Sequence, residues 1–222
     1  MTYPNDETPI VPVVARQYRD AHRETGTKGT LVQTARALFE SQGVASTTLA
    51  AVARGAHVSR TLLYYYFSSK DELVEAVLND CAEDFVDSIS LWNESRVFGH
   101  TPQELANFSR TLRRTLYGAD GTERPIVRVL DELGCRDEFM TRVLREAVSC
   151  ISDQVVSEYA AYHSIEISLV PEMFCVVLAG IARLYKVKPD ISDEDVSAII
   201  AQTLRLDMRV IDEPEWRESR DD

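Results

Sequence analysis

The chain has few of the residue patterns that build metal centres or disulfide frameworks. Its four cysteines lie far apart and form no CxxC pair, and its four histidines are equally scattered, without HxxxH or HExxH spacing. Scattered cysteines inside helical apolar patterns are usually buried thiols that pack as small hydrophobes. We therefore expect no disulfide framework, no metal site and no bound cofactor.

The sequence also lacks membrane and catalytic signals. No apolar run approaches the roughly 18 residues that a membrane helix needs. The first residues, MTYPNDETPIVPVV, are acidic and proline-containing, unlike the basic start and apolar core of a secretion signal. No nucleophile–base pair and no phosphate-cradling glycine loop is present. We expect a cytoplasmic protein that neither touches a membrane nor acts as an enzyme.

Charge is divided unevenly along the chain. The net charge is −12, which taken alone argues against a polyanionic partner. Residues 1–70, however, contain 8 Lys and Arg against 5 Asp and Glu, for +3, whereas residues 71–222 contain 16 against 31, for −15. A basic end on an acidic body orients a molecule toward a polyanion. The distribution favours nucleic-acid binding by the N-terminal part.

Apolar residues recur at helical spacing, and no alternating strand pattern exceeds four residues. The spacing predicts an all-α fold of about nine helices. After the helix that begins at Lys28, the predicted helices cover 48–54, 60–66, 70–92, 102–117, 125–133, 137–162, 170–187 and 192–211. Three parts follow from this pattern: an N-terminal arm (1–24), a three-helix domain (25–72) and a larger helical domain (73–222). The arm carries three arginines and is either a solvated tail or a basic segment that touches DNA.

Residues 28–78 carry the most informative motif. Gly43 stands where a left-handed helix end belongs, Thr47 or Thr48 is placed to cap the next helix, and Ser59 to cap the one after it. His57 occupies the turn between them, where a positive φ is expected. Two short helices joined by a tight turn have the lengths of a helix-turn-helix, whose second helix enters the major groove of DNA.

Three segments of this region, ALFESQG, TTLAAVARGAHVS and LLYYYFSSKDEL, together resemble the TetR/AcrR family of transcriptional repressors. The match spans about fifty residues in the family's gap pattern. It departs from the family's usual form twice. His57 stands where glycine is common, and Thr61-Leu62 replaces a frequent Gly-Thr pair, so an apolar side chain occupies a position that often offers DNA a hydroxyl.

The resemblance, together with the position of each residue, implies a set of DNA contacts. The expected DNA-binding residues are Thr48, Ser59, Arg60, Thr61, Leu62, Tyr64, Tyr65, Tyr66 and Lys70. Arg60 is expected to reach guanine O6/N7 or a phosphate, and Lys70 to anchor a phosphate at a helix start. Tyr65 and Tyr66 resemble the family's phosphate-contacting pair. Thr48 and Ser59 have a competing role as helix caps.

The resemblance also implies that residues beyond 73 bind an effector and dimerise. The aromatic residues expected to line a ligand pocket are Trp92, Phe108, Tyr117, Phe139 and Tyr159, although ordinary core packing explains any one of them as simply. The last two helices carry apolar stripes that, in the family, pair with their copies in a four-helix interface. The expected interface residues are Phe174, Leu178, Ile181, Tyr185, Ile199, Ile200 and Thr203.

These observations predict a homodimeric, ligand-responsive transcriptional regulator. In this hypothesis it is a repressor that releases a near-palindromic operator in double-stranded DNA when a small-molecule effector binds the C-terminal domain. One alternative stays open: an effector-independent DNA-binding protein, or a helical interaction protein that retains the fold. The acidic body and Leu62 are compatible with that alternative.

Overall fold

The computed structural model describes residues 26–97, 100–118, 121–162, 169–206 and 208, with the backbone alone at 150–162 and 170. Over these residues it is all-helical, as predicted. The helices are α2 (Gly26–Gln42), α3 (Leu49–Gly55), α4 (Arg60–Tyr66), α5 (Lys70–Ser95), α6 (Thr101–Leu116), α7 (Pro125–Leu133), α8 (Arg136–Tyr162), α9 (Val170–Val187) and α10 (Asp193–Leu204). The expected N-terminal arm lies outside the described residues.

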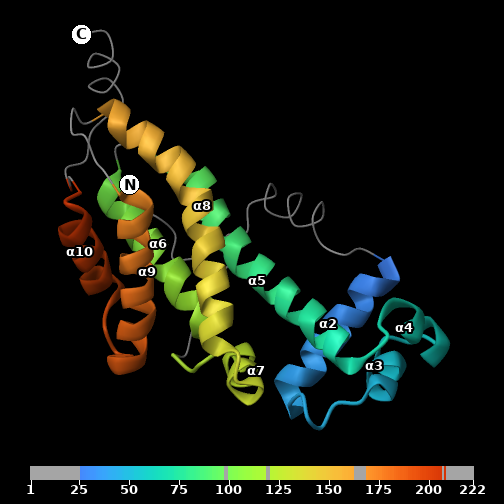
Figure 1. Ribbon diagram of the computed structural model, residues 1–222. Helices are drawn as coiled ribbons and strands as arrows, with labels where there is room; N and C mark the ends of the chain where they lie inside the picture. Colours follow the sequence, from blue (N-terminus) through green and yellow to red (C-terminus); the bar gives the residue numbers. More distant parts are fainter. Residues whose placement is uncertain (1–25, 98–99, 119–120, 163–168, 207, 209–222) are drawn as a thin grey trace, which may run out of the picture.

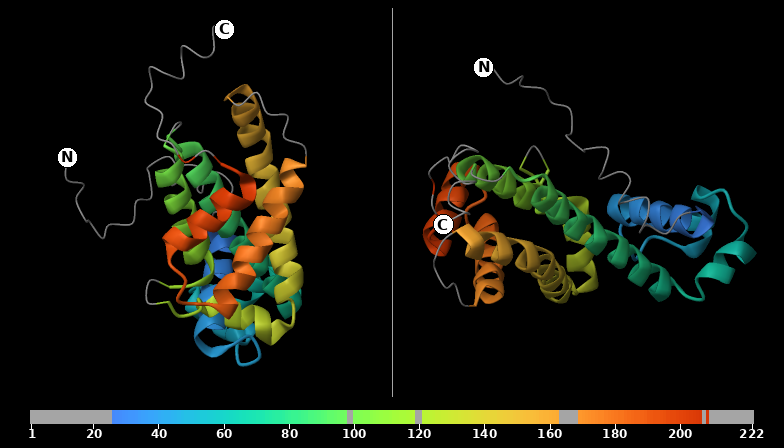
Figure 2. Two further views of the ribbon diagram at one scale, coloured as in Figure 1. Left: turned by 90° about the vertical axis from the view of Figure 1, so that its left-hand side faces the viewer. Right: turned by 90° about the horizontal axis from the view of Figure 1, so that it is seen from above.

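The molecule is elongated, with two groups of helices joined by α5 (Figure 1). Helices α2, α3 and α4 form a small unit at one end, and α6 to α10 form a larger bundle at the other. Helix α5 begins in the small unit and runs into the bundle, as the view from above shows (Figure 2). A single helix of 26 residues therefore connects the two parts directly.

The three-helix unit is built from caps and turns that the sequence predicts. Thr48 caps α3, and its hydroxyl accepts a hydrogen bond from the Ala51 N–H at 3.1 Å. Ser59 caps α4 in the same way, accepting from the Leu62 N–H at 3.1 Å. His57 has a φ of 57°, so the left-handed turn forms without glycine.

The long helix α5 buries one stripe and caps its own start. Ser69 accepts a hydrogen bond from the Glu72 N–H at 3.1 Å, and acidic residues fill the first turn, where they favour the helix dipole. Its buried stripe faces α2 at one end and α6 and α8 at the other. The hydrophobic core thus continues along α5 from the three-helix unit into the larger bundle.

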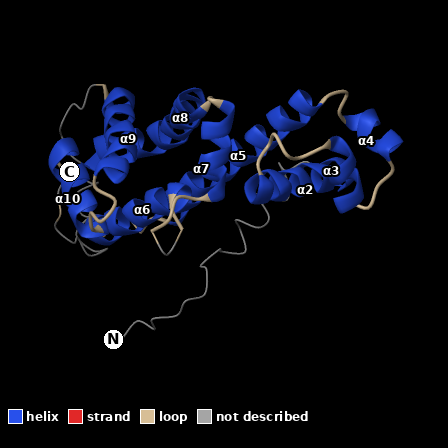
Figure 3. Ribbon diagram, turned by 90° about the horizontal axis from the view of Figure 1, so that it is seen from below, coloured by secondary structure: helices blue, strands red, loops and turns tan. Residues whose placement is uncertain are grey.

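The larger bundle packs α8 against α5 and α9, and α6 against α5 and α10. Figure 3 shows α9 and α10 at the end of the molecule away from α2, α3 and α4. The bounds of α7 and α9 agree with the sequence prediction. Helix α10, by contrast, ends at Leu204 rather than near residue 211, because Arg205 adopts a left-handed φ of 53°. None of the described helices has the length and apolarity needed to span a membrane.

Candidate nucleic-acid interface and effector pocket

Helix α4 presents a continuous outward face. Of its residues only Leu63 is buried, whereas Arg60, Thr61 and Leu62 in its first turn are exposed. Figure 1 shows that α4 lies at the extreme end of the three-helix unit, with α3 beside it. An exposed arginine in the first turn of such a helix has the position from which recognition helices contact base edges.

The three consecutive tyrosines differ in their exposure to solvent. Tyr65 is 79% exposed and Tyr64 55% exposed, while Tyr66 is half-buried and meets the Tyr65 ring edge-on at 5.1 Å. The flanking Leu63 and Phe67 are buried. Leu63 and Phe67 thus hold the helix end to the core, and two tyrosine hydroxyls are left facing outward.

The capping hydroxyls of Thr48 and Ser59 keep a second hydrogen-bonding function. Each uses its oxygen as the acceptor in the cap, so its proton stays available to a phosphate oxygen. Both side chains belong to exposed residues. Capping and phosphate contact are therefore compatible at these two positions.

Lys70, the expected phosphate anchor, has a contact inside the protein. Its Nζ donates a hydrogen bond to the Val44 carbonyl oxygen at 2.6 Å, in the loop between α2 and α3. An ammonium group has three protons, so this bond occupies one of them. Sequence reasoning missed this contact, because residues 44 and 70 are distant in the chain and come together only in the fold.

The same loop is held from the other side by α7. The Glu132 carboxylate accepts hydrogen bonds from the N–H groups of Val44, at 3.0 Å, and Ala45, at 2.7 Å. These two bonds lower the pKa of Glu132 below its ordinary value. Arg128 adds a bond to the Glu40 carbonyl oxygen at 2.5 Å. Helix α7 of the larger bundle thus holds the three-helix unit through side-chain hydrogen bonds.

Helices α2 and α5 are joined by a buried ion-pair cluster. The Arg36 guanidinium lies 2.8 Å from an Asp80 carboxylate oxygen and 2.6 Å from one of Asp84. The Arg36 and Asp80 side chains are each only about a tenth exposed. Gln33 donates a further bond to Asp80 at 2.7 Å. This cluster fixes the angle between the three-helix unit and α5.

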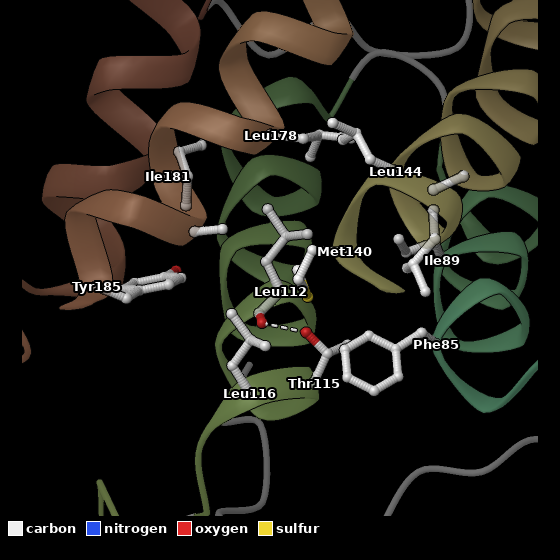
Figure 4. Close-up of a pocket in the computed structure, with 13 residues that line it drawn as sticks. Phe85, Ile89, Leu112, Thr115, Leu116, Met140, Leu144, Leu178, Ile181 and Tyr185 are labelled. Atoms are coloured by element: carbon white, nitrogen blue, oxygen red, sulfur yellow. Dashed lines mark hydrogen bonds between the residues drawn. The ribbon is translucent and has the colours of Figure 1, made fainter. Parts of the chain in front are cut away.

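A cavity opens between α5, α6, α8 and α9 in the larger bundle (Figure 4). Its empty space is about 440 Å³, a figure that includes volume open to solvent at the mouth. Its lining residues are Phe85, Ile89, Leu112, Thr115, Leu116, Met140, Val143, Leu144, Ala147, Leu178, Ile181, Ala182 and Tyr185. Two of these come from α5, so the helix that starts at Lys70 forms part of the cavity wall.

The described aromatic residues that were expected in a ligand pocket do not line this cavity. Trp92 packs on Phe108 at 4.4 Å between ring centroids and donates its indole N–H to the Glu104 carbonyl oxygen. Phe139 packs edge-on against the lining residue Phe85 at 5.8 Å. Trp92, Phe108 and Phe139 stabilise the core around the cavity. Aromatic residues at helical spacing indicate core packing as readily as they indicate a ligand pocket.

Tyr117 and Tyr159 are the other two aromatic residues that were expected in the pocket. Tyr117 is buried and meets the ring of Tyr185, which does line the cavity, at 6.0 Å. The side chain of Tyr159 lies outside the described residues. The described lining of this cavity is mainly aliphatic, and ligand contact by the expected aromatic residues stays a prediction.

The expected interface residues also separate into two groups. Ile199 and Thr203 are exposed on α10. The remaining five are buried within the protomer: Phe174, Leu178, Ile181, Tyr185 and Ile200. Three of these five line the cavity. A side chain inside its own protomer is not available to a partner, so an interface on α9 has to use the outward face, which carries Cys175, Val176, Ala179, Gly180 and Val187.

Within the described ranges, no three His, Cys, Asp or Glu side chains gather as a metal site would require. The arrangement is instead an exposed helix-turn-helix, a connecting helix and an apolar cavity. These features define a helix-turn-helix protein with a second, helical domain.

Comparison with known proteins matches the N-terminal part of the chain to one family. The profile described as "Bacterial regulatory proteins, tetR family" matches residues 31–77. The HTH-type transcriptional regulator TtgR of Pseudomonas putida is 40% identical over 70 residues, which are 32% of this chain and 32% of TtgR. Residues 31–77 are thus similar to the N-terminal domain of the TetR family. The match covers about a third of the length of the curated relatives.

Solved structures share the fold over most of the chain. Salmonella enterica GusR aligns with a TM-score of 0.59 at 18% identity, covering 81% of this chain and 96% of GusR. RolR, solved in complex with resorcinol, aligns with a TM-score of 0.50 at 18% identity, covering 92% of this chain and 95% of RolR. At these identities the likeness concerns the fold.

Proposed function

We propose that the protein is a homodimeric transcriptional repressor that binds a near-palindromic operator and releases it when a small molecule fills the cavity. The single observation that carries the proposal is the placement of α5. This helix follows the recognition helix at one end and supplies Phe85 and Ile89 to the cavity wall at the other. Any shift of α5 in response to a ligand therefore moves α4.

The DNA-binding half of the proposal is supported by the outward face of α4. Arg60 provides a donor for guanine or phosphate, and Tyr64 and Tyr65 provide hydroxyls for phosphate oxygens. Two such helices in a dimer have to lie about 34–36 Å apart to read successive major grooves. A modest rotation of each three-helix unit would change that spacing.

The ligand-responsive half is supported by the cavity and by the contacts around it. Helix α8 also lines the cavity, and α7, which immediately precedes it, holds the α2–α3 loop through Glu132. A ligand lowers operator affinity if it binds more tightly to a dimer whose spacing does not fit the operator. The loss equals the difference between the ligand's binding free energies for the two spacings, typically about 1–3 kcal/mol. The neighbour RolR, bound to resorcinol, supports a small-molecule site in this fold.

Dimerisation is supported by apolar residues on the outside of the last two helices. Val176 and Val187 on α9 are 70% and 76% exposed, and Ile199 on α10 is 38% exposed. Gly180 lies between the two valines, and a Cβ added there would meet nothing within 4 Å. Close approach of a second α9 at this point is sterically open.

The test is a binding experiment with the full chain and the DNA upstream of its own gene. Fluorescence anisotropy should show saturable binding that weakens steeply with salt, because phosphate contacts release counterions. Arg60→Ala should weaken operator binding, whereas Arg145→Ala, which removes an exposed arginine from α8, should not. Absence of binding at low salt to this DNA and to a randomised operator pool would remove the repressor function.

A further inference from the structure

The chemistry of the cavity wall restricts what can bind in it. Eleven of the thirteen lining side chains are hydrocarbon or thioether, and polar side-chain atoms come only from Thr115 and Tyr185 among the described lining residues. No lining residue in this set carries a charge. An ionised ligand group placed here would lose its water without gaining a counter-ion, which is strongly unfavourable.

Each of the two hydroxyls in the cavity wall already donates a hydrogen bond to a backbone carbonyl oxygen. Thr115 Oγ1 donates to the Leu112 carbonyl oxygen at 2.6 Å, the bond drawn in Figure 4. The Tyr185 hydroxyl donates to the Ser109 carbonyl oxygen at 3.1 Å. Each oxygen keeps lone pairs and no free proton. The wall therefore offers acceptors, and a ligand can use them only by donating a hydrogen bond.

Arg113 lies beside the cavity, and its guanidinium already pairs with other groups of the protein. The Arg113 guanidinium lies 4.6 Å from the centroid of the Tyr185 ring. Its Nε pairs with Asp193 at 2.7 Å, and its other nitrogens donate to the carbonyl oxygens of Ile191 and Pro189. Arg113 thus holds the start of α10 against α6. It does not line the cavity and cannot serve an anionic ligand without giving up these bonds.

Taking the ligand-responsive role proposed above as given, we propose that the cavity selects an uncharged, largely hydrocarbon effector whose polar group is a hydrogen-bond donor, such as a phenolic or alcoholic hydroxyl. Carboxylates and ammonium compounds of the same shape are excluded by the wall. A ligand that carries only acceptors binds through its hydrocarbon surface alone.

The first experiment compares four probes on one ring system by calorimetry with the full chain at neutral pH. The probes are naphthalene, 2-naphthol, 2-naphthoate and 2-naphthylmethylammonium. We expect 2-naphthol to bind about two- to tenfold more tightly than naphthalene, since one neutral hydrogen bond contributes a factor of that size. The two ionised probes should bind at least about 100-fold more weakly than naphthalene. Equal binding of either ionised probe, or binding of no neutral probe, overturns the proposal.

Variants locate the binding in the cavity. Ala182→Phe fills the space between α9 and the opposite wall and should abolish binding of both neutral probes. Arg145→Phe adds the same ring at an exposed position of α8 and should leave binding unchanged. If Ala182→Phe binds 2-naphthol as well as the unaltered chain does, the cavity is not the site.

A second pair of variants tests the acceptor role. Thr115→Val and Tyr185→Phe each remove one hydroxyl, and together they should bring the affinity for 2-naphthol down to that for naphthalene. Naphthalene binding acts as the internal control for folding, because it needs the cavity and neither hydroxyl. An unchanged preference for 2-naphthol in the double variant contradicts the donor-to-acceptor assignment.

A measurement with operator DNA distinguishes failure of this proposal from failure of the proposed function on which it rests. Operator affinity is measured with and without saturating 2-naphthol. If 2-naphthol binds in the cavity and operator affinity stays constant, the repressor-release mechanism fails while the ligand class stands. If a carboxylate releases the operator while neutral probes do not bind, the ligand class fails while the mechanism stands.

Discussion

The backbone N–H of Ala45 donates a hydrogen bond to the carboxylate of Glu132 at 2.7 Å, joining a loop of the DNA-binding unit to a helix of the larger bundle. The neighbouring N–H of Val44 donates to the same carboxylate, and the Val44 carbonyl oxygen accepts from Lys70. One short loop is thus fixed from both sides. A carboxylate that accepts two backbone N–H groups is a charge-assisted contact that depends on its ionised form.

We expect Glu132→Gln to make the protein less sensitive to acid while lowering its stability at neutral pH. The two hydrogen bonds lower the Glu132 pKa in the folded protein. The contact therefore stabilises fully above the ordinary glutamate pKa of about 4.3 and is lost as pH falls through the lowered folded value. Thermal unfolding midpoints measured from neutral pH down to about pH 3.5 should fall less steeply in the variant. Glu75→Gln, at an exposed position of α5, is the matched control. Parallel curves for Glu132→Gln and the unaltered chain would contradict the assignment.

Arg36→Met should destabilise the chain far more than an exposed arginine substitution does. The change leaves Asp80 buried with its guanidinium partner removed, and breaking a buried ion pair in this way typically costs about 3–5 kcal/mol. Chemical denaturation of Arg36→Met and of Arg145→Met, the exposed control on α8, gives the comparison. A loss under about 1 kcal/mol for Arg36→Met would show that the pairs with Asp80 and Asp84 contribute little.

Much of the DNA-binding unit is predictable from sequence because its determinants are local. The caps at Thr48 and Ser59 and the left-handed turn at His57 depend on neighbours within three or four residues. The hydrogen bonds of Glu132 and Lys70 to the α2–α3 loop join residues that are 26 to 88 positions apart in the chain. A single sequence carries no pattern that reveals such contacts.

The residues that line the cavity could not be separated from interface residues by sequence, for a different physical reason. A helix with apolar residues on two faces does not reveal which face meets its own core and which meets a partner. Helix α9 turns Leu178, Ile181 and Tyr185 inward, and the smaller residues Val176, Ala179 and Gly180 outward. The larger side chains therefore serve the protomer, and aromatic size alone did not identify ligand contacts.

Arg60→Ala should reduce operator preference by about 1–3 kcal/mol if the guanidinium reads a base. The exposed first turn of α4 allows base or phosphate contact, and the two differ in their dependence on sequence. Anisotropy titrations with operator DNA and with random DNA of equal length distinguish them. Equal losses on both would assign Arg60 to phosphate, and Arg145→Ala serves as the control for the change in charge.

Lys70→Ala should weaken binding to all DNA sequences alike and lower the slope of log K against log salt by about one. Because Lys70 also holds the Val44 carbonyl oxygen, we expect a lower unfolding temperature as well. Lys70→Arg keeps the charge and a donor, so it should restore the salt slope. An unchanged slope in Lys70→Ala, with reduced stability, would leave Lys70 with the loop contact alone.

Val176→Glu should convert the proposed dimer to a monomer and weaken operator binding without unfolding the chain. Val176 is 70% exposed in the protomer, so a glutamate there is tolerated in a monomer, but two copies placed face to face on α9 would bring like charges into an apolar interface. Light scattering after size-exclusion chromatography gives the mass, and circular dichroism checks the helix content. Val97→Glu is the matched control, since Val97 is also exposed, at 56%, and lies in the segment after α5. A dimer of unchanged mass in Val176→Glu would place the interface on another surface.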